Sequence, residues 1–234
     1  MKTSLSVVGA VLVALGIFGC DNTPAEKQET SQVQSAQQTA TVSMTDDQKF
    51  AYLLGAQFGV PPYLNVPQQI GEMLEYDAMV QGVVDVVKAY KDSTFSYQLD
   101  SLTMKKIDSD YAAVATSRAA AGDNAAPIKL AGPMTNQPVQ LADTSSSIQK
   151  YSYMMGMQIG SMFIGVWRNF EQEFDVNYFV LGFREGISAE VDPNFKVSLP
   201  RDSIKAVNSR YVKRIQKIMD DRRQKQNGAA PAAP

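Results

Sequence analysis

One pair of residues in this chain has the types and spacing of a catalytic nucleophile and its base. Ser147 is followed three residues later by Lys150, a pattern that in some acyl-transfer enzymes places a hydroxyl beside an amine. The companion motifs of those enzymes are missing, and both residues fall in the predicted first turn of a helix. Helix capping explains the pattern better than catalysis does, so we predict no catalytic residue.

The chain offers little else for catalysis, metal binding or cofactor binding. It contains no histidine, which removes the most common general base and metal ligand. The acidic pairs Asp46-Asp47 and Asp220-Asp221 lack the spacing of a calcium loop, and the first pair suits a helix N-terminus. No glycine-rich phosphate loop occurs, and a net charge of -2 gives no indication of nucleic-acid binding. We expect neither a metal nor a cofactor.

Cys20, the only cysteine, follows a segment with the features of an export signal. A basic start at Lys2 is followed by an apolar run from Leu5 to Phe18, which is typical of a secretory signal peptide rather than of a membrane-spanning helix. The ending from Ile17 to Cys20 resembles the lipobox of bacterial lipoproteins, in which cleavage leaves the cysteine as the first residue and lipid is attached to it. An ordinary signal cut elsewhere would leave an unexplained thiol.

Lipidation of Cys20 predicts that the protein is held at a membrane, because acyl chains contribute about 0.8 kcal/mol for each buried methylene. We therefore expect a protein of the bacterial cell envelope that faces the periplasm or the exterior, with the inner or outer membrane left open. Residues 21–44 are rich in Gln, Thr, Ser and Ala, a composition typical of a flexible tether.

The chain carries an internal duplication. Residues 48–59 and 149–160 are similar along their whole length, and identities continue afterwards at a slightly shorter offset. Function must therefore be sought in a repeated module. The identical pairs are Lys49/Lys150, Tyr52/Tyr153, Gly55/Gly156, Gln57/Gln158, Gly59/Gly160, Gly82/Gly182, Phe95/Phe195, Leu99/Leu199, Ser109/Ser209 and Tyr111/Tyr211.

Each copy predicts three helices and gives no strand signal, so the expected fold class is all-α. The first helix of each copy opens with a capping box, Thr45 with Gln48 and Ser146 with Gln149, in which a hydroxyl satisfies a first-turn amide. Apolar residues then recur at steps of three and four, the spacing of one buried helix face. They are Phe50, Leu53, Leu54 and Phe58, and Tyr151, Met154, Met155, Ile159 and Met162.

The second helix of each copy is predicted over residues 75–90 and 175–189. A longer third helix follows in each copy, and in the second copy we expect Ser198 to cap it, with Pro200 in its first turn. The residues expected to face inward are Met79, Val83, Phe179 and Phe183 in the second helices, and Met104, Ile107, Tyr111, Val114, Ile204, Val207, Tyr211, Ile215 and Ile218 in the third.

Six glycines lie inside the predicted helices, where each costs up to about 1 kcal/mol relative to alanine. Such a cost suggests close helix packing, at a helix crossing or a dimer interface. The four-residue spacing also matches membrane helix dimers, but a glutamine, an asparagine and three prolines interrupt any spanning run in the first copy. The glycines are Gly55, Gly59, Gly82, Gly156, Gly160 and Gly182.

The export signal, the two repeats and the composition of the stretches between them divide the chain into six segments. We predict a lipoprotein signal peptide at 1–19, the lipidated cysteine and tether at 20–44, the first repeat at 45–121, a linker at 122–144, the second repeat at 145–226 and an Ala- and Pro-rich tail at 227–234.

Two parts of the second repeat could meet a partner. Residues 201–225 hold nine basic and three acidic residues, so the last helix could contact anionic lipid or an acidic client, or could simply present a solvated face. A methionine- and aromatic-rich surface could adapt to varied apolar clients, although core filling also explains most methionines. The residues expected to contact clients are Met154, Met157, Met162, Trp167 and Phe170.

The run from Lys150 to Gly160, followed by the run from Phe174 to Glu185, resembles the amino-terminal domain of FKBP-type peptidyl-prolyl isomerases of the macrophage infectivity potentiator class. That domain has a tyrosine-containing helix with a G-x-x-x-G step, then an acidic residue, an aromatic and a glycine. These last three are Asp175, Phe179 and Gly182 in the second repeat. The first repeat is a weaker match, through Tyr52, Gly55, Gly59, Glu75, Met79 and Gly82.

In that family the domain forms an intertwined helical dimer, and a long helix carries the catalytic FKBP domain. No strand-rich segment of about 100 residues follows the long helix here, so the resemblance implies the dimerising and client-holding part, present twice. The two repeats could pair within one chain as a pseudo-dimer, or each could pair with another molecule.

The resulting expectation is a lipid-anchored protein that assists protein folding without catalysing it, as a chaperone or a dimerisation module. Its partners would be unfolded or partly folded clients, a second copy or an FKBP-type isomerase, and the membrane through Cys20. One alternative is a pure scaffold that pairs with a true isomerase. The other is a protein with residual peptidyl-prolyl isomerase activity.

Overall fold

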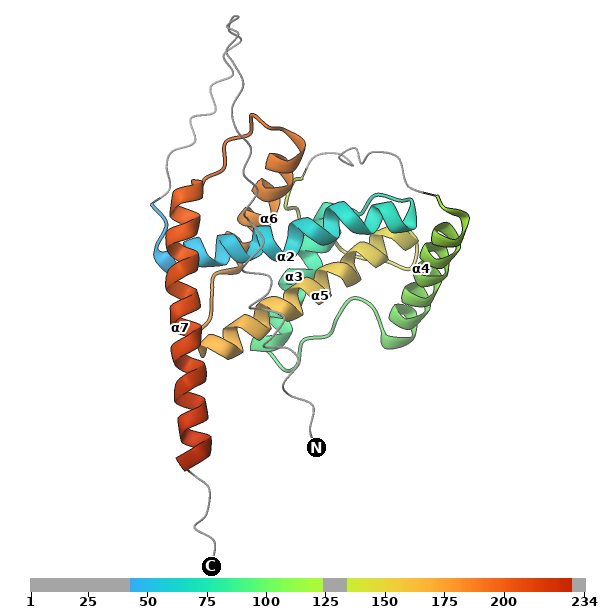
Figure 1. The fold of residues 1–234 in the computed structure, drawn as a ribbon. Coiled ribbons are helices and arrows are strands. Elements are labelled where there is room, and N and C mark those ends of the chain that lie inside the picture. The colour runs from blue at the N-terminus through green and yellow to red at the C-terminus, as the bar shows by residue number, and fades with distance from the viewer. Residues whose placement is uncertain (1–42, 124–133, 229–234) are drawn as a thin grey trace, which may run out of the picture.

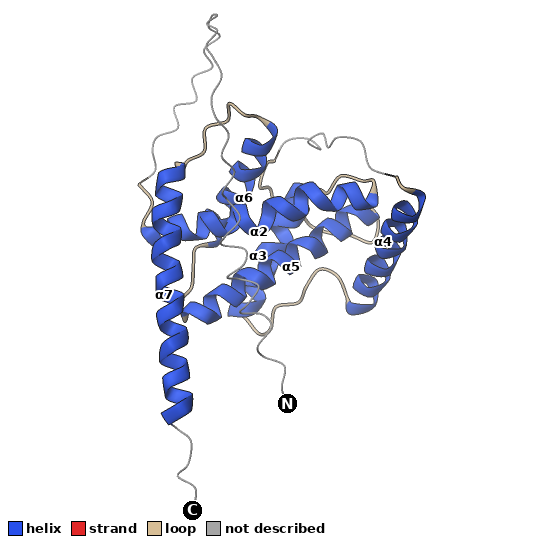
Figure 2. Cartoon of the chain, in the orientation of Figure 1, coloured by secondary structure: helices blue, strands red, loops and turns tan. Residues whose placement is uncertain are grey.

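The computed structural model describes residues 43–123 and 134–228. All regular structure in these two stretches is helical, which confirms the all-α prediction (Figure 1 and Figure 2). The predicted signal peptide, Cys20, nearly all of the tether and residues 229–234 lie outside the described part. The helices are α2 (Asp46–Ile70), α3 (Tyr76–Lys91), α4 (Ser101–Ala121), α5 (Ser147–Phe170), α6 (Val176–Val191) and α7 (Arg201–Gly228).

The first helix of each copy begins at the predicted cap. Thr45 accepts a hydrogen bond from the Gln48 amide at 3.3 Å, and the Gln48 side chain accepts one from the Thr45 amide at 2.9 Å. Ser146 caps α5 by accepting from the Gln149 amide at 3.1 Å. Local side-chain chemistry therefore sets the start of both helices.

The helix α2 runs through three prolines, Pro61, Pro62 and Pro67. Each proline lacks an amide donor and would usually break a helix interior. Here the buried side chains of Tyr63 and Ile70 keep this part of α2 against the core. The helix ends at Ile70. The next residue, Gly71, has the left-handed conformation, and its amide donates to the Pro67 carbonyl at 2.8 Å.

The start of α7 differs from the prediction. The helix begins at Arg201, so Pro200 precedes it instead of lying in its first turn. Ser198 does not cap α7. Its amide and its hydroxyl both donate to the Glu185 carboxylate on α6 at 2.6 Å. Glu185 is buried, and a buried carboxylate needs donors more than a solvated helix end does. A tertiary contact therefore replaces the expected cap.

Most predicted inward positions lie in the core. The four positions in the second helices are fully buried, and the apolar positions near the start of α2 are buried as well. The predictions for Val114 and Met162 are wrong, because both side chains are exposed. On α4 only Ile107 and Tyr111 are buried, so this helix touches the body along a narrower stripe than its apolar residues suggest. Tyr151, Met104, Ile204 and Ile218 are half-buried.

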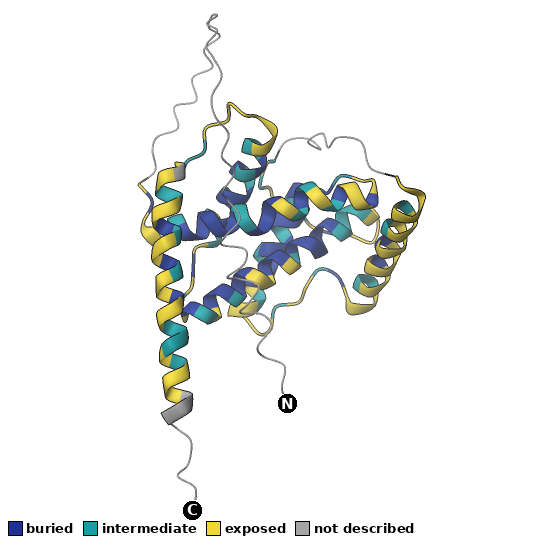
Figure 3. Cartoon of the chain, in the orientation of Figure 1, coloured by how far each residue is buried: buried dark blue, intermediate teal, exposed yellow. Residues whose placement is uncertain are grey.

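The helices pair across the two copies. α2 packs along α6, and α3 packs along α5; each pair joins one helix from the first copy with one from the second. The remaining helices, α4 and α7, flank this body on opposite sides (Figure 1). Figure 3 shows the consequence, because the exposed residues of α4 and α7 face outward while the four crossed helices carry most of the buried ones.

Both flanking helices are held by a stacked aromatic pair. Tyr111 of α4 stacks on Tyr151 of α5 with ring centroids 4.2 Å apart. Tyr211 of α7 stacks on Phe50 of α2 at 3.7 Å. These contacts use corresponding residues of the two copies, so α4 and α7 are attached to the body in the same way.

The second half of the predicted linker lies along α3. The amide of Asn136 donates to Asp77 at 2.8 Å, and the amide of Val139 donates to Gln81 at 3.1 Å. Leu141 is buried. Residues 134–142 therefore extend the core without regular secondary structure, because side chains of α3 and Gln98 in the following loop accept from their backbone amides.

Candidate functional site

The predicted crossing glycines lie where helix backbones touch. A methyl group on Gly55 would meet the Phe179 carbonyl of α6, and one on Gly182 would meet the Tyr52 carbonyl of α2. The crossing of α3 and α5 repeats this arrangement. There a methyl on Gly82 would meet the Tyr153 carbonyl, and one on Gly156 would meet the Met79 carbonyl.

The remaining two glycines lie one turn further along the first helices. A methyl group on Gly59 would overlap the Phe183 ring, and one on Gly160 would lie 3.1 Å from the Val83 backbone. Backbone atoms cannot rotate away as a side chain can, so the four contacts with carbonyls require the absence of a side chain. Those four glycines set the distance between the crossed helices, while Gly59 leaves room for a ring and Gly160 for a tight contact.

A buried tyrosine and carboxylate join each crossed pair, a feature that the sequence reasoning missed. The Tyr52 hydroxyl of α2 donates to Glu185 of α6 at 2.6 Å. The Tyr153 hydroxyl of α5 donates to Asp85 of α3 at 3.1 Å. The signal was present, because both the tyrosines and the carboxylates occupy corresponding positions in the two copies.

These hydroxyls are poor candidates for catalysis. Burial, followed by the hydrogen bond to Glu185, raises the pKa of Tyr52 well above its usual value. Burial likewise raises the pKa of Tyr153. Both groups stay protonated and donate to a carboxylate throughout the ordinary pH range, so they can hold helices together but cannot act as a base or a nucleophile.

The five predicted client-contact residues are split between core and surface. Met154, Trp167 and Phe170 are buried, Met157 is half-buried, and Met162 is 45% exposed. A client could reach the first three only from an opening beside them. Such an opening exists at Trp167.

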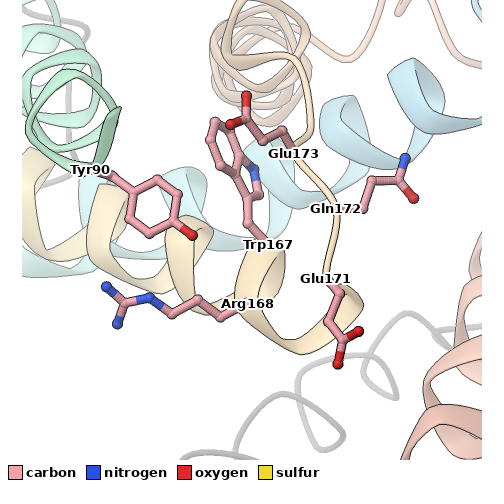
Figure 4. Close-up of a pocket in the computed structure, with 6 residues that line it drawn as sticks. All are labelled: Tyr90, Trp167, Arg168, Glu171, Gln172 and Glu173. Atoms are coloured by element: carbon pink, nitrogen blue, oxygen red, sulfur yellow. The ribbon is translucent and has the colours of Figure 1, made fainter. Parts of the chain in front are cut away.

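A pocket of about 420 Å³ lies where the ends of α3 and α5 meet the loop before α6 (Figure 4). Tyr90 of α3 stands at one side, with 43% of its surface exposed. Its ring meets the Trp167 ring edge-on, with centroids 5.8 Å apart and planes at 81°. The lining residues are Tyr90, Trp167, Arg168, Glu171, Gln172 and Glu173.

Charged side chains surround these two rings. The Lys91 ammonium lies 5.3 Å from the Trp167 ring centre and pairs with Glu173 at 2.6 Å. The Arg168 guanidinium lies 5.3 Å from the Tyr90 ring centre. Cations over aromatic faces are attracted by the ring quadrupole, so these charges add to the core packing that holds Trp167 in place.

Trp167 brings a buried donor to the pocket. Its side chain is 2% exposed, and its indole nitrogen has no hydrogen-bond partner among the described residues. Figure 4 shows this nitrogen on the edge of the ring that faces away from Tyr90. A buried donor without an acceptor costs about 1–3 kcal/mol. The nitrogen itself is inaccessible to solvent, so a carbonyl oxygen would recover that cost only once the neighbouring side chains moved aside.

The backbone is strained at the pocket. Glu171 ends α5 in the left-handed conformation, with φ at 53°. The corresponding residue of the first copy is Gly71, which ends α2 with φ at 79° and has no side chain to strain. A non-glycine residue in this region costs about 1–2 kcal/mol. Glu171 uses its carboxylate to pair with Arg222 of α7 at 2.9 Å.

The described residues include no group of three or more cysteine, histidine or acidic side chains arranged to hold a metal ion. Within 43–123 and 134–228, none of the helices combines the length and apolar character needed to cross a bilayer. Comparisons of the chain with protein-family models, with curated proteins and with solved structures found no match.

Proposed function

We propose that the chain is a tandem of two domains similar to the amino-terminal domain of FKBP-type isomerases, paired with each other inside one molecule. The crossed packing supports this. Each crossing takes one helix from each copy, and in each a pair of glycines brings the helix backbones into contact. The buried tyrosine–carboxylate bonds join the same helix pairs.

Internal pairing favours a protein that acts by itself. The faces that would meet a separate isomerase in an intertwined dimer already pack against the other copy. A scaffold role through the same faces would require both crossings to open, which would expose Met79, Phe179 and other fully buried side chains. The arrangement therefore supports a holding chaperone over a scaffold that pairs with a true isomerase.

In this proposal the protein is held in the cell envelope by lipid on Cys20 and binds exposed apolar segments of unfolded clients. The observation that carries the client-binding role is the pocket with a buried indole donor. A carbonyl of an extended client would accept from Trp167 once the side chains around its nitrogen move aside, and the exposed face of Tyr90 would cover an adjoining apolar side chain. Aromatic-lined grooves bind extended proline-rich segments in other proteins.

The mixed charges at the pocket suit clients of varied sequence. Lys91 pairs with Glu173 and Glu171 pairs with Arg222, so the rim carries both signs of charge. Backbone carbonyls are present in every client. Recognition through one backbone hydrogen bond and an aromatic contact is therefore weak and sequence-tolerant, as a holding chaperone requires.

The test is suppression of aggregation of a chemically unfolded protein by residues 22–234, which include all of the described fold, at near-equimolar ratio. Tyr90→Ala removes the exposed ring of the pocket and should weaken suppression. Tyr97→Ala is the matched control, because Tyr97 is 38% exposed, lies in the loop after α3 and does not line the pocket. We expect suppression by the parent chain and the control, and loss with Tyr90→Ala.

Trp167→Phe refines the test, since it removes the donor and keeps most of the ring. A hydrogen bond contributes about 0.5–1.5 kcal/mol, so client affinity should fall by about 2- to 12-fold. Equal suppression by the parent chain and both pocket variants would refute the pocket as the client site. Acceleration of a proline-limited peptide assay by the purified chain would instead support the residual isomerase alternative.

A further inference from the structure

The solvent side of α7 carries a compact basic face. Arg210, Lys213, Arg214 and Lys217 follow one another at steps of three, one and three, which places all four on one side of a helix. All four side chains are exposed. Val207, Tyr211 and Ile215 lie in the core on an adjoining side of α7. The basic face therefore runs along the border between the body and the solvent.

This charge is not needed to hold a helix at this place in the fold. α4 is attached to the body as α7 is, through the same aromatic stack. Its 21 residues contain three basic and two acidic side chains, whereas residues 201–225 contain nine basic and three acidic ones. The duplication therefore allows α4 and α7 to be compared. They pack in the same way but differ in charge, so the positive charge of α7 is not explained by packing.

Part of the basic face is left without an acidic partner. Arg210 pairs with Asp46, while Arg214 lies over the Phe170 ring with 5.5 Å to its centre. None of the ion pairs formed by the described residues includes Lys213 or Lys217. These two ammonium groups are available to an anionic surface.

The described chain begins beside this face. Met44 is buried, Asp46 pairs with Arg210, and the Tyr211 hydroxyl donates to Asp47. These contacts hold the N-terminal end of α2 against the middle of α7. Cys20 precedes Met44 by 24 positions, a length of chain that spans at most about 85 Å. A lipid on Cys20 would keep the bilayer within reach of α7.

We propose that the basic face of α7 rests on the anionic phospholipid headgroups of the membrane that holds the anchor. Each basic residue close to an anionic bilayer contributes about a fivefold gain in binding. Four cations, one of them paired with an acidic residue, would bind a bilayer only weakly by themselves. A chain anchored in the same bilayer keeps α7 close to the headgroups, and the resulting high local concentration strengthens this binding. The anchor and the helix together would fix which side of the protein faces the periplasm or exterior.

This orientation depends on the proposed anchor at Cys20, whereas the attraction of α7 to lipid does not. The test therefore uses residues 22–234, which lack the anchor and retain every described residue. Their binding is measured to sedimented vesicles of phosphatidylcholine with and without phosphatidylglycerol, at low and at high salt. If the chain does not bind vesicles, the proposed lipidation of Cys20 is unaffected. If Cys20 is not lipidated, the expected vesicle binding is unaffected.

Lys213→Gln with Lys217→Gln is the informative variant, and Lys105→Gln with Lys106→Gln on α4 is its match, with the same loss of two charges on an exposed helix. We expect binding only to the phosphatidylglycerol vesicles, reversed by salt and weakened by about 25-fold in the α7 variant. The α4 variant should bind as the parent chain does. Circular dichroism checks that both variants keep their helices.

Two results would overturn the proposal. One is equal binding of the parent chain and the α7 variant to phosphatidylglycerol vesicles. The other is binding to poly-glutamate, lost in the α7 variant, without binding to the vesicles, which would assign the face to an acidic protein partner.

Discussion

Gly182→Ala is the sharpest perturbation of the crossed packing, because it adds a single methyl group at the contact between α2 and α6. The added carbon would meet the Tyr52 carbonyl of α2. A carbonyl belongs to the helix backbone and cannot rotate aside, so the two helices must separate. The matched control is Gly165→Ala in α5, where an added methyl meets nothing within 4 Å.

The two substitutions should change the free energy of unfolding in opposite directions. In a helix interior, alanine is better than glycine by about 1 kcal/mol, and Gly165→Ala should gain about this amount. At Gly182 the same gain is opposed by overpacking, which costs about 1–3 kcal/mol and more against rigid backbone. We expect Gly182→Ala to lose about 2 kcal/mol net, a difference of about 3 kcal/mol between the variants.

The assays are urea unfolding and thermal unfolding, each followed by circular dichroism and by the fluorescence of Trp167, the only tryptophan. For a domain of this size the melting temperature should fall by about 4–8 °C in Gly182→Ala and rise by about 2–4 °C in Gly165→Ala. A Gly182→Ala chain as stable as the parent would refute the close crossing and the pairing derived from it.

A double-mutant cycle then tests which helices cross. Gly55 and Gly182 lie in the same crossing, so the second methyl should cost less once the first has separated the helices. Gly55 and Gly156 lie in different crossings, so their costs should be closer to additive. Equal coupling in the two cycles would contradict the assignment of the crossings.

Four further results are expected. Tyr52→Phe should lose about 1–3 kcal/mol of stability, because its buried carboxylate acceptor loses a donor, whereas the exposed Tyr97→Phe should change it by under about 0.5 kcal/mol; urea midpoints decide. Glu171→Gly should be at least as stable as the parent, since relief of about 1–2 kcal/mol of strain exceeds an exposed ion pair; lower stability would show that the pair dominates. Burial raises the pKa of Tyr111 to about 12, above the unfolded value of about 10, so the contribution of this residue to stability should be fully present below pH ~10 and be lost as the pH rises beyond it; a urea midpoint unchanged between pH ~9 and ~11 would contradict this. Cys20→Ser should move the full-length protein from the detergent phase to the aqueous phase in a partition assay, and retention in detergent would refute lipid anchoring there.

Only part of the candidate site could be predicted from the amino-acid sequence. Trp167 was among the predicted client contacts, but its aromatic neighbour Tyr90 is 77 positions away on another helix, and no periodicity relates the two. The strain at Glu171 becomes visible only when its backbone angle is compared with that of Gly71. Site residues brought together by crossed helices carry no spacing signal, so they escaped prediction.

Amino-acid sequence by itself determined the features that depend on near neighbours along the chain. The caps at Thr45 and Ser146 and the three- and four-residue apolar steps rest on contacts within one helical turn, and the duplication is visible without any structure. The glycines indicated close helix crossings, because a glycine destabilises a helix interior unless close packing requires it.

Only the tertiary structure decided which helices meet. Apolar faces of similar width could pair within a copy or across copies, and the choice depends on contacts between residues about 130 and 70 positions apart, such as Tyr52 with Glu185 and Tyr153 with Asp85. Ser198 shows the same effect locally, because the buried Glu185 takes the donors that were expected to cap α7. Burial makes such contacts stronger than local preferences, and burial exists only once the helices have packed.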